Sequence, residues 1–123
     1  MATLTEGKHD GEFISELAMG IGYHVDLGTL ISGQNHSAGT VVGKISASGK
    51  YTILAPAAAT GEQAVAGITY ANANATTADL TTRFMLRGPA IVNGNDLVWP
   101  AGITAPQKAT AIAQLLALGI KVA

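Results

Sequence analysis

The sequence predicts a mainly β fold of the α+β class, with one short helix near the C-terminus. Between residues 39 and 99, short runs rich in Val, Ile, Thr and aromatic residues are separated by turns of Gly, Pro and Asn. Only after residue 103 do apolar residues recur at helical spacing. The 123 residues suit a single globular unit. Within it we expect an N-terminal arm over residues 1–37 and a β-rich core over residues 38–123.

The N-terminal arm is poorly patterned. Residues 1–11 carry no apolar periodicity and are expected to form a flexible tail. The apolar residues of "FISEL" then have helical spacing, but Gly20 and Gly22 should end such a helix early. Residues 23–27 alternate loosely, as in a short strand. An apolar segment interrupted by glycines in this way is typical of an arm that gains structure on a partner.

The core segment alternates strands and turns. "GTVVGKI" and "YTIL" flank the turn "SASGK", in which Gly49 can take a positive φ, so the two runs predict a hairpin. "AVAGITYA" is expected to be a buried strand, with Gly67 at a bulge or a close backbone approach. "NANATTAD" is predicted as a loop. "LTTRFMLRGPAIV" is one long strand or two strands bent at Gly88-Pro89, "NGND" is a tight turn and "LVW" is the last strand of this series.

The C-terminal segment predicts the helix. Thr104 is a good N-cap, and Gln107 three residues later completes a capping box. Gly119 is placed to end the helix, and "IKV" is then expected as an edge strand. The stripe predicted to face the core consists of Ala109, Ile112, Ala113 and Leu116.

Composition excludes several classes of function. The net charge is −1 and no basic stripe occurs, so nucleic-acid binding has no electrostatic basis. No apolar run approaches the roughly 18 residues of a membrane span. The chain has no cysteine, which excludes disulfides and thiolate metal sites. Charged residues make up only 12%, against roughly 25% in typical domains, and 48% are hydrophobic. This balance indicates a surface partly covered by other protein.

The residues give little support for catalysis. His24 and Asp26 would share one face of a strand, and Glu12 and Glu16 would share one face of a helix. A solvated or hydrogen-bonded pair is the favoured interpretation in both cases, and a small hydrolase using His24 and Asp26 is the alternative. No histidine or carboxylate spacing predicts a metal site. We therefore expect no enzyme activity, cofactor or metal.

Trp99 is the only tryptophan, and it is followed by Pro100 and the predicted helix start. A tryptophan at a strand end is most simply a lid on the core, with its N–H bonded to a carbonyl or to water. An interface anchor is the alternative, because tryptophan is enriched in binding hot spots.

Four stretches of the chain, taken together with their order along it, resemble the phage head decoration proteins typified by the phage lambda capsid-stabilising protein. "DLVWPAGITAPQKATAIAQLLALGIKV" is similar to their C-terminal segment, with a Trp-Pro closing a strand before a short helix. "GEFISE" is similar to their N-terminal motif. "SGQNHSAGTVVGKI" and "SGKYTILAPAAATGEQAVAGITY" are similar to their first strands. The resemblance covers about residues 11–123.

The resemblance implies a small β-rich, barrel-like or tulip-like subunit that assembles as a homotrimer. Such trimers sit on the outer surface of the expanded head and clamp neighbouring subunits of the major capsid protein. The subunit is made in the host cytoplasm, and its N-terminal arm orders on the capsid. A fibre or baseplate module of a phage is the alternative. The expected capsid-contacting residues are Glu12, Phe13, Ile14, Ser15, Glu16, Tyr23 and Val25.

Overall fold

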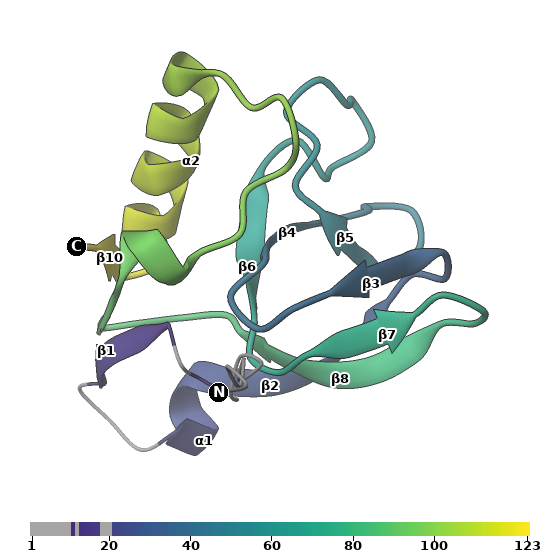
Figure 1. The fold of residues 1–123 in the computed structure, drawn as a ribbon, viewed down its shortest axis with the longest axis horizontal. Helices are drawn as coiled ribbons and strands as arrows, with labels where there is room; N and C mark the ends of the chain where they lie inside the picture. Colours follow the sequence, from purple (N-terminus) through teal and green to yellow (C-terminus); the bar gives the residue numbers. More distant parts are fainter. Residues whose placement is uncertain (1–10, 12, 18–20) are drawn as a thin grey trace, which may run out of the picture.

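The computed structural model describes residues 11, 13–17 and 21–123. Its largest part is a closed barrel with strand order β2-β5-β4-β6-β8 (Figure 1). Closure gives every barrel strand two neighbours, so none of them presents a free edge. The mainly β class predicted from the sequence is confirmed. The barrel strands are β2 (Val25–Leu30), β4 (Val41–Lys44), β5 (Tyr51–Ile53), β6 (Val65–Thr69) and β8 (Leu80–Met85).

The predicted hairpin is confirmed, because β4 and β5 pair antiparallel around a turn in which Gly49 has a φ of +71°. The close approach at Gly67 is also confirmed. A Cβ at this glycine would lie 2.7 Å from the carbonyl oxygen of Met85 on β8. The bend at Gly88-Pro89 separates β8 from β9 (Ala90–Val92), so the long segment forms two strands.

The loop predicted for "NANATTAD" is wrong in its first part. Ala73–Ala75 forms β7, which pairs antiparallel with β3 (Gln34–His36). The alanine side chains are buried and Asn74 is exposed, so the strand has the usual alternation. The segment is too polar to indicate a strand by itself, and its partner lies almost forty residues earlier in the chain.

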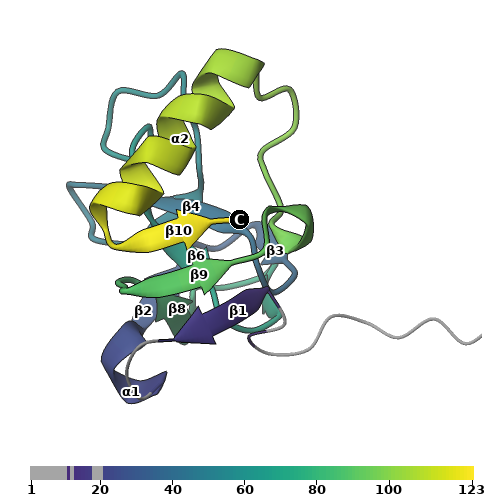
Figure 2. The ribbon, with the colours of Figure 1, turned by 90° about the vertical axis from the view of Figure 1, so that its left-hand side faces the viewer.

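A second, three-stranded sheet stands beside the barrel, with strand order β1-β9-β10 (Figure 2). Its outer strands are β1 (Ile14–Leu17), antiparallel to β9, and β10 (Ile120–Val122), parallel to β9. The edge strand expected from "IKV" is confirmed. The helical expectation for "FISEL" is wrong, because pairing with β9 draws these residues into a strand. A short helix, α1 (Ile21–His24), then leads into β2.

The division at residue 37 therefore does not match the architecture. β2 and β3 lie before that residue, and β2 pairs along its whole length with β8 in the barrel. Of the expected arm, residues 1–10, 12 and 18–20 lie outside the described residues. The first described residue, Gly11, is already attached, since its N–H donates to the carbonyl of Tyr70 at 2.8 Å.

The predicted C-terminal helix is confirmed as α2 (Ala105–Ala117), with Thr104 and Gln107 forming the capping box. The predicted buried stripe is wrong. Ala111 and Leu115 are the buried residues of α2, whereas Leu116 is 61% exposed and Ala109 and Ala113 are exposed as well. Apolar residues occur on more than one face of this alanine-rich helix, so the period alone could not select the face that packs on the barrel and on β10 (Figure 2).

The tight turn expected at "NGND" is confirmed as a single 3₁₀ turn over Gly94–Asp96, in which the Asn93 side chain accepts a hydrogen bond from the N–H of Asn95. The strand expected from "LVW" is wrong. "LVW" contributes only an isolated bridge between Val98 and Thr40, instead of a strand.

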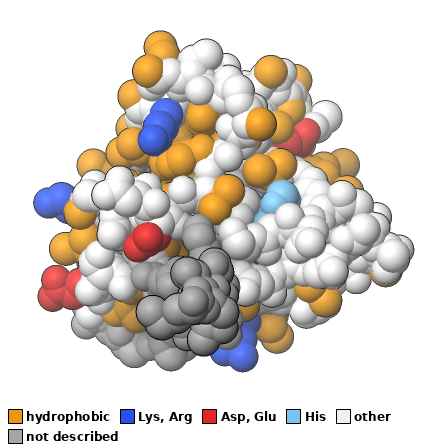
Figure 3. Space-filling view, in the orientation of Figure 1, with side chains coloured by type: hydrophobic (Ala, Val, Ile, Leu, Met, Phe, Trp, Pro, Cys, Tyr) orange, Lys and Arg blue, Asp and Glu red, His pale blue; other side chains and the backbone are white. Residues whose placement is uncertain are grey.

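The core has two parts. One lies between the barrel, the three-stranded sheet and α2, and it includes Phe13, Leu115 and Ile120. The other lies within the barrel, where the rings of Tyr51 and Phe84 stack at 4.3 Å. On the face shown in Figure 3, hydrophobic side chains are widespread and charged side chains are few and scattered. This surface agrees with the low charge content of the sequence.

Candidate functional site

The segment from Gly11 to Leu17 is held in place by the three-stranded sheet. The carbonyl of Phe13 accepts a hydrogen bond from the N–H of Asn93 at 2.8 Å, and β1 pairs with β9. The Phe13 side chain is 1% exposed and belongs to the core. Backbone pairing and a buried aromatic ring together make this segment part of the folded subunit.

The expected capsid-contacting residues differ in their exposure to solvent. Ser15 and Glu16 are exposed on β1, while Ile14 is half-buried and packs against the core. Phe13 and Val25 are buried in the core, so the structure moves these two from the expected contact surface to the interior. Their apolar character reflects packing within the subunit. Glu12 lies outside the described residues.

Tyr23 lies on α1 with its side chain 48% exposed. The Arg87 guanidinium lies over its ring, 5.7 Å from the centroid, and donates a hydrogen bond to the Tyr23 carbonyl. The same guanidinium forms an ion pair with Asp26 at the start of β2. Leu27 on β2 is 70% exposed. The stretch from Tyr23 to Leu27 thus presents two large apolar side chains to the outside.

His24 and Asp26, the pair considered for hydrolysis, have different environments. The His24 side chain is fully buried, and its Nδ1 lies 3.0 Å from the carbonyl oxygen of Arg87. Asp26 is exposed and pairs with the Arg87 guanidinium. A general base must reach substrate, and a ring enclosed in this way has no access to one.

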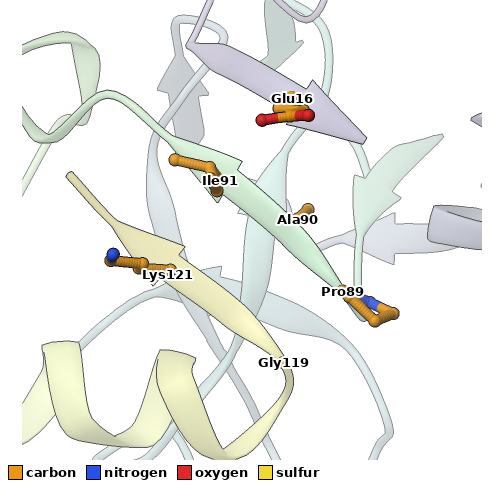
Figure 4. Close-up of a pocket in the computed structure, with 6 residues that line it drawn as sticks. All are labelled: Glu16, Pro89, Ala90, Ile91, Gly119 and Lys121. Atoms are coloured by element: carbon orange, nitrogen blue, oxygen red, sulfur yellow. The ribbon is translucent and has the colours of Figure 1, made fainter. Parts of the chain in front are cut away.

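An open hollow of about 370 Å³ lies on the outer face of the three-stranded sheet. Three of the side chains that line the hollow stand in a row on the three strands, as Figure 4 shows: Glu16 on β1, Ile91 on β9 and Lys121 on β10. The floor of the hollow is largely apolar. The remaining lining residues are Pro89, Ala90 and Gly119.

The Trp99-Pro100 corner lies between the isolated bridge and α2. Trp99 is half-buried against the first part of the core, and the Lys108 ammonium from α2 lies 5.3 Å from its ring centroid. The Trp99 Nε1 atom is buried and has no hydrogen-bond partner among the described residues. The packing of the ring against the core agrees with the core-lid interpretation, but the carbonyl partner expected for its N–H is not found among the described residues. An interface role for Trp99 stays a prediction.

Two kinds of site are not found in the described part of the chain. No group of three or more His, Asp or Glu side chains in residues 11, 13–17 and 21–123 could hold a metal ion. Over the same residues, no helix is long and apolar enough to cross a membrane.

Comparison with known families decides the broad role. The family model for the bacteriophage lambda head decoration protein D matches residues 3–120. The chain belongs to this family. No curated protein matches the chain significantly. The resemblance seen in the sequence is confirmed, and with it a structural role in the phage head: this decoration protein associates with the capsid and is part of the virion.

Sequence reasoning missed part of the decoration protein's surface. The sequence indicates Ile91 and Lys121 only as members of strands, and Leu27 only as part of a strand-like run. The alternation in "IKV" could have indicated Lys121, since an edge strand with two apolar neighbours around a charge points that charge outward. Nothing in the sequence could have placed Glu16 and Lys121 on the same sheet. Their strands, β1 and β10, are joined only through β9, which comes from a different part of the chain.

Proposed function

We propose that this decoration protein binds as a homotrimer on the outer surface of the expanded phage head and clamps neighbouring subunits of the major capsid protein. The match to the decoration family over residues 3–120 carries the proposal. The work of the protein is then binding free energy and not chemistry. The buried ring of His24 supports a role without catalysis.

The proposed capsid contact consists of the chain before Gly11 together with exposed side chains on the segments that follow. The N–H of Gly11 donates to the carbonyl of Tyr70, so the point at which the preceding chain joins the subunit is fixed. Ser15, Tyr23 and Leu27 are exposed and lie on segments close to that point in the sequence. A short segment that orders on binding covers a wide surface at a cost in free energy, and three such arms per trimer compensate by multivalency.

The low charge of the chain fits this role. A net charge of −1 gives no attraction for nucleic acid, so a nucleic-acid partner is not part of the proposal. Subunits made in the host cytoplasm would assemble as trimers and then add to heads that have already expanded. Capsid sites around a local threefold axis match the symmetry of the trimer.

Deletion of residues 1–10 tests the capsid contact. The truncated protein keeps Gly11, Phe13 and β1, so we expect the wild-type circular dichroism spectrum and the wild-type mass in solution. Its co-sedimentation with expanded, undecorated heads should weaken at least tenfold, since a lost contact of about 1.4 kcal/mol changes Kd tenfold and is repeated in each arm. Wild-type affinity of the truncated protein would contradict the arm contact.

Tyr23→Ala tests the second part of the contact surface. Truncation of an interface tyrosine costs about 1–2 kcal/mol, so we expect Kd for heads to rise roughly 5- to 30-fold. Leu116→Ala is the matched control, because Leu116 is also a large exposed apolar residue but lies on α2. If the full-length protein forms a trimer but does not bind expanded heads, a fibre or baseplate module would be the better interpretation.

A further inference from the structure

The outer face of the three-stranded sheet carries an ordered row of three side chains. Ile91 is paired in register with Glu16 on one side and with Lys121 on the other. Residues directly opposite each other in a sheet point to the same face. The neighbours of Ile91 and Lys121 on their own strands point the other way, into the core, as Ala90, Val92 and Ile120 are buried. The row therefore reads acid, apolar, base across the sheet (Figure 4).

The two ends of this row are unusual in their lack of partners. Among the described residues, Glu16 and Lys121 are the charged side chains with no ion pair, hydrogen bond or ring contact. The other described charges all have one: Lys50 with Asp79, Arg87 with Asp26, Glu62 with Thr60, Lys44 over Tyr51, Arg83 over Tyr70, Lys108 over Trp99, and Asp96. β9 keeps Glu16 and Lys121 apart within one subunit, so these two exposed charges are available for ion pairs with another molecule.

A second copy of this chain supplies matching charges. A threefold ring is built from head-to-tail contacts, so each subunit must present two different and complementary edges. The three-stranded sheet does this, since its β1 edge carries the acid and its β10 edge carries the base. Three such sheets around an axis would place each Glu16 beside a Lys121, with the three Ile91 side chains directed toward the axis.

We propose that this face is the subunit interface of the trimer, with Glu16 of one copy paired to Lys121 of the next and the hollow around Ile91 closed against the threefold axis. The inference rests on the homotrimer of the proposed function and names its contact surface. It also assigns Glu16 to contact between subunits in place of contact with the capsid. Burial of Ile91, Pro89 and the surrounding hollow supplies the apolar part of the contact.

Charge reversal tests the interface. Glu16→Lys, Lys121→Glu and the double exchange are compared with the wild type by sedimentation equilibrium at low salt, about 50 mM, where screening is weak. Each single reversal replaces attraction by repulsion at three contacts. We expect the concentration at which half the trimer dissociates to rise about tenfold, on the order expected for exposed charge pairs, and the double exchange to restore it. Lys44→Glu, an exposed reversal on β4, is the matched control.

Ile91→Thr provides an independent measure, because it keeps a β-branched residue in β9 and replaces the ethyl branch with a polar hydroxyl. It too should weaken the trimer, without any change of charge. Single reversals without effect, or a double exchange that fails to restore the trimer, would overturn this interface while leaving the homotrimer intact. A wild type that is monomeric at every concentration would overturn the homotrimer itself. A stable dimer would also overturn the ring, since the row would then pair with itself across a twofold axis.

Discussion

Replacement of Phe13 by alanine tests whether the segment before β2 belongs to the folded subunit. The sequence places Phe13 in an arm expected to gain structure on a partner, whereas the structure buries its ring to 1% exposure in the core. The Phe13 carbonyl also accepts a hydrogen bond from Asn93, so the ring and the backbone are fixed together. Truncation leaves a cavity at the junction of the three-stranded sheet and the barrel.

The expected loss is large. Phe→Ala in a core costs about 3–5 kcal/mol, from lost transfer free energy and from the cavity that remains. A domain of this size has a free energy of unfolding of about 5–15 kcal/mol. For a chain of 123 residues, each kcal/mol lowers Tm by roughly 3–5 °C, so we expect Tm to fall by about 10–20 °C.

Thermal and urea unfolding, followed by circular dichroism, give the measurement. Protein concentration must be held constant, because trimer formation contributes to apparent stability through mass action. Tyr23→Ala is the control, since Tyr23 is 48% exposed and loss of its ring contact with Arg87 should lower stability by no more than about 1 kcal/mol. Equal stabilities of the two variants would contradict this prediction, because they would mean that the Phe13 segment is not docked on the free subunit.

Three further predictions concern local structure. Gly67→Ala should cost about 1–3 kcal/mol in urea unfolding, because its Cβ would meet the Met85 carbonyl at 2.7 Å, whereas Gly22→Ala, with nothing within 4 Å, should cause no loss. Thr104→Ala should cost about 1 kcal/mol by removal of the N-cap of α2, and Thr104→Ser should retain most of it. Burial lowers the pKa of the His36 imidazole, so the unfolded chain binds a proton more readily. The free energy of unfolding, measured with urea, should therefore decline as pH falls from about 6.5 through the folded-state pKa of His36. A His36→Gln variant should lack this decline. An equal decline of its urea midpoint over the same pH range would show that His36 is not the cause.

The parts of the fold that depend on neighbouring residues could be predicted from the sequence. The capping box of α2 lies within four residues, and the β4–β5 hairpin is set by the turn at Gly49. Gly119 ends α2 with a φ of +87°, as its position after the last apolar turn indicated. Local chemistry determines each of these features, so they can be found without knowledge of the partner strands.

Features that depend on distant pairing could not be predicted. "FISEL" has helical spacing but forms β1, because β9, more than seventy residues later, offers it a strand partner. The side of α2 that packs inward could not be predicted for a similar reason, since the surface that it covers is assembled from the barrel and β10. The spacing of apolar residues and their intrinsic conformational preferences leave more than one structure open for each segment. Contacts with the rest of the fold determine which structure forms.

The class of the fold, the position and caps of the helix, and membership of a phage head decoration family can all be inferred without the structure. Each depends on local chemistry or on the order of motifs along the chain. Which of the arm residues are buried and which are exposed depends on tertiary packing. It also brought Glu16 and Lys121 to opposite edges of one sheet, because strands from the two ends of the chain meet on β9. Pairing between segments so far apart depends on the whole packed core, and no local pattern encodes it.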